Sequence, residues 1–259
     1  MNVKINKDIL APYLLFNKPI KYDTHITLYP VIMNDVLTFQ ILIQSITVRK
    51  NSIFRDKKII KMSYLDFLFY CLGNKELETT YKISGLSQYY FYAVQLLQLC
   101  CKDTEIKLNE QTGKIYINSE LITPQIFDDL RRIIIIQNGV NFNIDEFMNQ
   151  DTENRLLKIK QDANKNNNEA SLEDYIDSLI IALNSSEEKI MNMSIRKFWR
   201  YIKRYQLYEN YTISKTGECS GMVKFKEPIK YWMVSLEENK DKYKNFKANE
   251  TELRSKIEG

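Results

Sequence analysis

The sequence predicts an α-dominated α+β protein, and three observations support this fold class. Apolar residues recur at helical spacing along most of the 259 residues. Glycine and proline are scarce, at 7 and 5, whereas sandwiches and barrels with many tight turns use more of them. Two short runs with alternating apolar residues flank a turn near position 113. With 44% hydrophobic residues the chain can bury a sizeable core, as one large or two small domains.

The first predicted elements are an extended segment and a helix. Residues 20–32 alternate partly and contain β-branched residues, which is typical of a strand that ends near Pro30. Asn34 or Asp35 can cap a helix whose apolar residues follow at once, namely Val36, Leu37, Phe39, Ile41, Leu42 and Ile43.

Two helices and a hairpin follow. In "KMSYLDFLFYCLG", Ser63 is a suitable N-cap, and Gly73 stands where the glycine just past a helix end is expected. "ISGLSQYYFYAVQLLQLCC" has a helical pattern dense in tyrosine and leucine, which indicates core packing. The alternating runs 104–109 and 114–118 flank a turn that contains Gly113, and they predict a β-hairpin.

"ITPQIFDDLRRIIIIQNGV" predicts the next helix from its boundary residues. Thr123 can cap its start, and Pro124 takes the first helical position, where a missing N–H costs nothing. Gly139 ends the helix after Asn138.

This helix has an unusually wide apolar surface. One face carries Ile126, Leu130, Ile133, Ile134 and Gln137, while Asp128, Arg131, Arg132 and Ile135 occupy much of the remainder. Asp128 and Arg132 are four residues apart and can form an ion pair. Either the helix is central to its domain, with both arginines reaching outward, or its second apolar strip binds a partner. The candidate protein-binding residues are Ile133, Ile134, Ile135 and Ile136.

The Asn-rich run "NKNNNEA" has no apolar periodicity and marks a boundary. We predict a mixed α+β domain over residues 1–162, an Asn-rich linker over 163–170, and a helical domain with a charged C-terminal tail over 171–259. In the last of these, Ser171 and Asp174 form a capping-box pattern. The apolar face that follows comprises Leu172, Tyr175, Ile176, Leu179, Ile180 and Leu183.

Two further helices complete the helical domain. Ser185 or Ser186 can cap a short helix through Met191, and Ser194 precedes a helix with apolar residues at spacings of three and four. Phe198 and Trp199 on this last helix are further candidates for protein binding. The same helix carries five basic residues that could instead contact nucleic acid, or simply face solvent: Arg196, Lys197, Arg200, Lys203 and Arg204.

Several classes of function lack their sequence signals. The net charge is only +4, which is a weak excess for a nucleic-acid binder. The four cysteines show no CxxC spacing, and the single histidine cannot complete a zinc site of standard spacing, so we expect neither a metal nor a cofactor. No Walker A, HExxH, EF-hand or GxGxxG motif is present, so we expect no enzymatic activity. The absence of a signal-peptide or membrane-span pattern predicts a cytoplasmic protein with reduced thiols and no membrane partner.

Four stretches together resemble tail-module proteins of tailed phages and prophages of low-GC Gram-positive bacteria. They are "ITLYPVIMNDVLTFQ", "LITPQIFDDLRRIIIIQNGV", "SLEDYIDSLIIALNSSEEKIMNMSIRKFWRYIKR" and "SGMVKFKEPIKYWM". The resemblance implies a tail assembly chaperone, a small helix-rich protein without catalytic residues that holds tail or tape-measure subunits soluble in the host cytoplasm, and that could also self-associate. The alternatives are a structural component of the virion, such as a baseplate or connector subunit, and a nucleic-acid-binding regulator.

Overall fold

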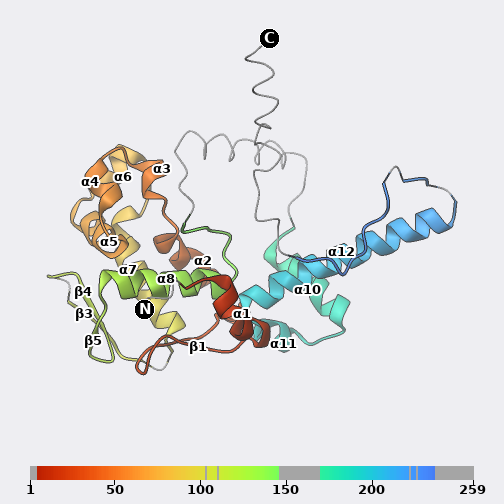
Figure 1. Cartoon of the computed structure of the whole chain (residues 1–259), viewed down its shortest axis with the longest axis horizontal. Helices are drawn as coiled ribbons and strands as arrows, with labels where there is room; N and C mark the ends of the chain where they lie inside the picture. The colour runs from red at the N-terminus through yellow and green to blue at the C-terminus, as the bar shows by residue number, and fades with distance from the viewer. Residues whose placement is uncertain are drawn as a thin grey trace, which may run out of the picture. The chain divides into compact units, whose positions relative to one another are not determined.

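The structure is a computed structural model that describes residues 5–102, 104–109, 111–145, 170–221, 223–225 and 227–236. Helices dominate the fold (Figure 1), and two small antiparallel sheets accompany them, which confirms the predicted α-dominated α+β class. The chain divides into two compact units, residues 1–198 and residues 199–259. The predicted linker lies almost entirely outside the described residues, so the predicted domain limits stay predictions.

The N-terminal helix α1 (Lys7–Phe16) was not predicted from the sequence. The Asn6 side chain accepts a hydrogen bond from the Ile9 N–H at its start, and Leu10 and Leu14 are buried. The predicted strand over 20–32 is wrong in its extent, because it forms only β1 (Ile20–Lys21) and β2 (Thr27–Leu28), paired antiparallel. The Asp23 carboxylate accepts two backbone N–H bonds and closes a turn between these strands.

The helical core of the first unit is built from α2 (Val36–Leu42), α5 (Tyr64–Gly73) and α7 (Tyr89–Cys100). The Ser63 hydroxyl caps α5 as predicted, but Gly73 is its last helical residue and has no positive φ. Short helices that the sequence did not predict connect these elements: η1 (Met33–Asp35), η2 (Ile43–Ile46), α3 (Lys50–Ile53), α4 (Lys57–Lys61), α6 (Glu76–Tyr81) and η3 (Leu86–Gln88).

The predicted hairpin is confirmed. Strands β3 (Ile106–Asn109) and β4 (Lys114–Ile117) pair antiparallel, and β5 (Glu120–Leu121) adds a third strand. Gly113 has φ +63° in the turn, and a β-carbon there would lie 2.5 Å from the ring of Phe69. The turn therefore needs glycine for its backbone conformation and for its close approach to α5.

Helix α8 (Pro124–Gln137) is central to the first unit. Thr123 caps it, and Gly139 follows it with φ +70°, both as predicted. Seven of its residues are buried: Phe127, Leu130, Arg131, Ile133, Ile134, Ile135 and Gln137. The helix is thus enclosed on more than one face, which supports the interpretation that it belongs to the core.

Two expectations for the arginines of α8 are corrected. Arg131 does not reach outward, because its side chain is only 7% exposed. The pair between Asp128 and Arg132 does not form, since Arg132 instead makes two hydrogen bonds, of 2.7 and 3.0 Å, with the carboxylate of Asp145 beyond the helix. Asp128 lies 4.0 Å from Arg131, its neighbour at i+3.

The C-terminal helices are α10 (Leu172–Leu183), α11 (Glu187–Met191) and α12 (Ile195–Cys219). The predicted capping box of Ser171 and Asp174 is present at the start of α10. Of the predicted apolar face of α10, only Leu179 is fully buried. The chain between α11 and α12 contacts the N-terminal part of the first unit through an antiparallel β-bridge of Ile32 with Ser194.

Candidate functional site

The first predicted protein-binding group lies inside the first unit. Ile133, Ile134 and Ile135 of α8 are 1%, 1% and 3% exposed, and Ile136 is half-buried. A buried side chain presents no surface to a partner while the unit is folded. The structure therefore places these isoleucines in the core, the other role that the sequence left open for them.

The second predicted group, Phe198 and Trp199, lies at the boundary between the two units. Phe198 is fully buried, at 0% exposure, and belongs to the first unit. Trp199 is half-buried and is the first residue of the second unit. Neither side chain is fully exposed.

The five basic residues of α12 do not form one free cationic face. Arg196 donates a hydrogen bond of 3.0 Å to the Leu14 carbonyl, and its side-chain stem lies against Gly139. Arg204 donates to the backbone carbonyls of Trp232 and Val234. Of the remaining three, Lys197 and Arg200 are half-buried and Lys203 is exposed. At least two of the five positive charges are therefore held by protein groups.

Arg204 fastens residues 227–236, which we call the strap, to the middle of α12. The Trp232 ring packs against Tyr208 with centroids 5.3 Å apart, at an interplanar angle of 78°. Tyr231 packs against Tyr211 at 5.4 Å and 88°. Such edge-to-face pairs and the hydrogen bonds from Arg204 give the strap a defined position on the helix.

The second unit exposes an unusual share of large apolar side chains. Of the seventeen such side chains exposed in the described residues, eight lie in this unit: Tyr201, Tyr208, Ile213, Val223, Phe225, Tyr231, Met233 and Val234. Ile213 and Met233 are 67% and 60% exposed. Exposed tyrosine, methionine and aliphatic groups at this density mark surfaces where other proteins bind. Three of these side chains belong to α12, three belong to the strap, and Val223 and Phe225 lie between the two. We call all eight side chains the α12–strap surface.

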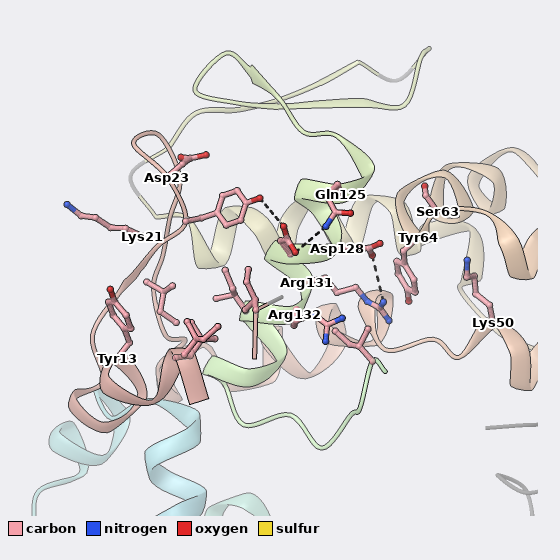
Figure 2. A pocket seen from close by; sticks show the side chains of 18 of the residues that line it. Tyr13, Lys21, Asp23, Lys50, Ser63, Tyr64, Gln125, Asp128, Arg131 and Arg132 are labelled. Carbon is pink, nitrogen blue, oxygen red and sulfur yellow. Dashed lines mark hydrogen bonds and ion pairs between the residues drawn. The ribbon is translucent and has the colours of Figure 1, made fainter. Parts of the chain in front are cut away.

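A separate pocket of about 1000 Å³ lies within the first unit (Figure 2). Part of its wall is apolar and comes from α1, β1, α8 and the chain after α8: Ile5, Ile9, Leu10, Tyr13, Ile20, Ile133 and Ile144. The rest is rich in charged and polar groups: Lys21, Tyr22, Asp23, Lys50, Ser63, Tyr64, Gln125, Asp128, Asp129, Arg131 and Arg132.

Burial shifts the titration of several groups in this pocket. It lowers the pKa of the Lys50 ammonium, although the nearby Asp128 carboxylate opposes the shift. It raises the pKa of the Asp128 carboxyl in turn, with Arg131 as the main opposing charge. Burial, together with a hydrogen bond to Asp129, raises the pKa of Tyr22 to about 12. All of these shifts disfavour the charged form, as expected for ionisable groups that are partly removed from water.

Sequence reasoning missed most of this pocket. Lys50 comes from α3, Tyr64 from α5 and Tyr22 from the turn after β1, and no local pattern connects these positions with α8. The strap was likewise missed, although its adjacent Tyr231 and Trp232 are the kind of aromatic residues that could have indicated a packed segment.

Two kinds of feature are absent from the described residues, a metal site and a membrane-spanning helix. No group of three or more His, Cys, Asp or Glu side chains within the described ranges is arranged to hold a metal ion. None of the helices in those ranges combines the length and apolar composition that crossing a membrane requires.

Comparison with known proteins relates one part of the chain to phage. No curated protein and no solved structure matches the sequence. Residues 163–237 match the family model of the YomV second domain, and YomV is a protein of Bacillus phages and prophages. The matched segment contains α10, α11, α12 and the strap, so the α12–strap surface lies in the part of the chain that is similar to a phage protein domain.

Proposed function

We propose that this chain is a non-catalytic phage assembly factor, a chaperone that binds a tail or tape-measure protein through the α12–strap surface. The observation that carries the proposal is the concentration of exposed apolar side chains in the second unit, within the segment similar to a phage protein domain. An amphipathic segment of a partner can bury such a surface, as helices do in hydrophobic grooves.

The charges around this surface favour a protein partner over nucleic acid. Arg204 is occupied by the strap carbonyls, whereas binding to phosphates would need it free. Glu209 lies on the same helix as Lys203, and Glu218 forms an ion pair of 2.6 Å with Lys215, so charges of both signs occur along the helix. An apolar surface bordered by charges of both signs is typical of protein interfaces.

The test uses the full-length tagged chain expressed in phage-producing cells. Ile213→Asp and Met233→Asp place a charge at two strongly exposed apolar positions, and Gln206→Asp places the same charge at an exposed polar position of α12. We expect the first two variants to recover at least about tenfold less tail or tape-measure protein, by quantitative mass spectrometry, than the wild type and Gln206→Asp. Equal recovery by all four chains would contradict binding through this surface.

The same preparations distinguish the two alternative functions. A structural virion component would remain in purified mature particles, where immunoblotting detects it, whereas an assembly factor is absent from them. A nucleic-acid-binding regulator would recover nucleic acid, with a high ultraviolet absorbance ratio that falls steeply as salt is raised.

A further inference from the structure

The pocket of the first unit has two different ends. Figure 2 shows Tyr13 and Lys21 on one side of the view and Lys50 and Tyr64 on the other, with Arg131 close to Tyr64. The apolar part of the wall is made mainly by residues of α1, β1 and α8, such as Ile9, Ile20 and Ile133. A ligand that fills the pocket therefore meets both apolar surface and buried charge.

The two cations beside Tyr64 have backbone carbonyls as their hydrogen-bond acceptors. Arg131 Nε donates to the Ile46 carbonyl at 2.6 Å, and the Lys50 ammonium donates to the Met62 carbonyl. The Asp128 carboxylate is 4.0 Å from Arg131, which is too long for a hydrogen bond. Among the described residues, then, neither cation has a carboxylate in hydrogen-bonding contact, although burial of a cation is costly without one.

Arg131 is held in a fixed orientation. Its guanidinium lies 3.6 Å from the centroid of the Tyr64 ring. The Tyr64 hydroxyl is itself fixed, because it donates to the Ser45 carbonyl and accepts from the Val48 N–H, both at 3.0 Å. A guanidinium stacked on a fixed aromatic ring loses little entropy when it binds an anion, because its planar donor groups are already oriented.

Three other charged groups near Lys50 and Arg131 already have hydrogen-bond partners. Asp129 accepts hydrogen bonds from the Tyr22 hydroxyl at 3.1 Å and from Gln125 at 3.4 Å. Arg132 is held by Asp145. Asp66, which attracts Lys50, accepts the Ser63 hydroxyl at 2.6 Å. Of the groups that line this end, Lys50 and Arg131 bring two positive charges and Asp128 one negative charge, so one positive charge is in excess.

We propose that this pocket binds a carboxylate carried on an apolar body. The carboxylate lies between Lys50 and Arg131, where it supplies the missing negative charge, and the apolar body covers the accessible part of the wall formed by Ile9, Tyr13 and Ile144. Either a free amphiphilic acid or the C-terminal residue of a protein carries this chemistry. The proposal concerns the first unit and is independent of binding through the α12–strap surface.

Isothermal titration calorimetry of the full-length chain tests this site with four ligands. They are octanoate, its neutral analogue octanamide, an N-acetylated dileucine with a free carboxylate, and inorganic phosphate. We expect octanoate or the dileucine to bind, with about tenfold or more lower affinity in Lys50→Met. Lys21→Met removes the same charge from the exposed side of the pocket and is expected to change the affinity less than about twofold.

Each other outcome overturns a stated part of the proposal. If octanamide binds as tightly as octanoate, the carboxylate is not recognised, and this comparison needs no variant to fold. Phosphate that binds as tightly as octanoate would show that the apolar wall does not contribute. Equal losses of affinity in Lys50→Met and Lys21→Met would show that only long-range electrostatic attraction holds the ligand. The absence of measurable heat from any ligand at about 10 mM would contradict the site itself. The tighter of octanoate and dileucine identifies a free acid or a protein chain end as the source.

Discussion

At the scale of single residues, Arg131 and Tyr64 are held together by several contacts in the first unit. The guanidinium lies over the ring, and each side chain is also tied to a backbone carbonyl of η2, Ile46 for the arginine and Ser45 for the tyrosine. The two residues thereby connect α8, α5 and η2 through polar contacts inside an apolar core. Removal of either side chain leaves a buried backbone group without its partner, which costs roughly 1–3 kcal/mol.

Ionisation of the Tyr64 phenol is expected to lower the stability of the protein at alkaline pH. Burial raises the pKa of Tyr64 from 10.0 to about 12, although Arg131 opposes the shift. Because the folded state favours the neutral phenol, this stabilising contribution is complete below pH 10 and is lost as the pH rises from 10 towards 12. We expect the free energy of unfolding in urea to fall less steeply over pH 9–11 in Tyr64→Phe than in the wild type.

Tyr92→Phe is the control for this experiment, since Tyr92 is only half-buried and its hydroxyl donates to the side chain of Gln88, four residues earlier in the chain. It is expected to keep the wild-type slope. At pH 7, Tyr64→Phe should lose roughly 1–3 kcal/mol, because the Ser45 carbonyl and the Val48 N–H lose their partner. Parallel slopes for Tyr64→Phe and the wild type would mean that the phenol ionises normally.

The sequence predicts local features of these residues well and their partners poorly. Thr123, Pro124 and Gly139 define the limits of α8 because each acts on its own neighbours. The environment of Arg131 could not be predicted, because Ile46 is 85 positions earlier in the chain. A helical wheel shows which residues share a face, but it cannot show that a carbonyl and an aromatic ring will be available to an inward-facing arginine.

At the scale of elements, two of the glycines that the sequence analysis placed at element boundaries have different roles. Gly113 has a positive φ and lies against the Phe69 ring. Gly73 ends α5 without a positive φ, and a β-carbon there would meet nothing within 4 Å. The sequence shows only that each glycine stands at the edge of a predicted element. The close neighbour of Gly113 belongs to another element and becomes visible only in the folded chain.

This contrast predicts opposite effects of the same substitution. Gly113→Ala should lower the free energy of unfolding by roughly 2–4 kcal/mol, because alanine is strained at positive φ and its methyl group overlaps the Phe69 ring. Gly73→Ala should be neutral or stabilising by up to about 1 kcal/mol, since alanine is the better helix former. Urea denaturation of both variants measures the difference. A Gly113→Ala variant as stable as Gly73→Ala would contradict the described turn.

At the scale of the whole molecule, the segment that is similar to a phage protein domain and the two compact units have different boundaries in the chain. The segment similar to a phage protein domain begins at residue 163, whereas the first compact unit continues to residue 198. Within this unit, the Met33 N–H donates to the Met193 carbonyl and the Ile195 N–H to the Val31 carbonyl, both at 2.9 Å. Residues 193–195 of the matched segment therefore pair with residues 31–33 of the N-terminal part of the chain.

We therefore expect residues 163–237 not to fold fully when they are produced alone. Ile190 and Phe198 are completely buried in the intact unit and would be exposed in the fragment. Circular dichroism should show less helix per residue than the full chain and no cooperative thermal transition. A full-length chain cleaved at an inserted protease site near residue 165 is the control, and it should keep its helix content. A cooperative transition in the fragment would show that the segment folds on its own.

The β-bridge of Ile32 with Ser194 also restricts which C-terminal and N-terminal parts can be combined by recombination. Recombination between genes at the similarity boundary would join a new C-terminal part to an N-terminal part that had not been selected with it. The incoming part must then offer a backbone in the right register next to residues 31–33, or the hybrid loses this contact. Residues on the two sides of the bridge are thus expected to be exchanged together, and compatible hybrids should be found among closely related genomes.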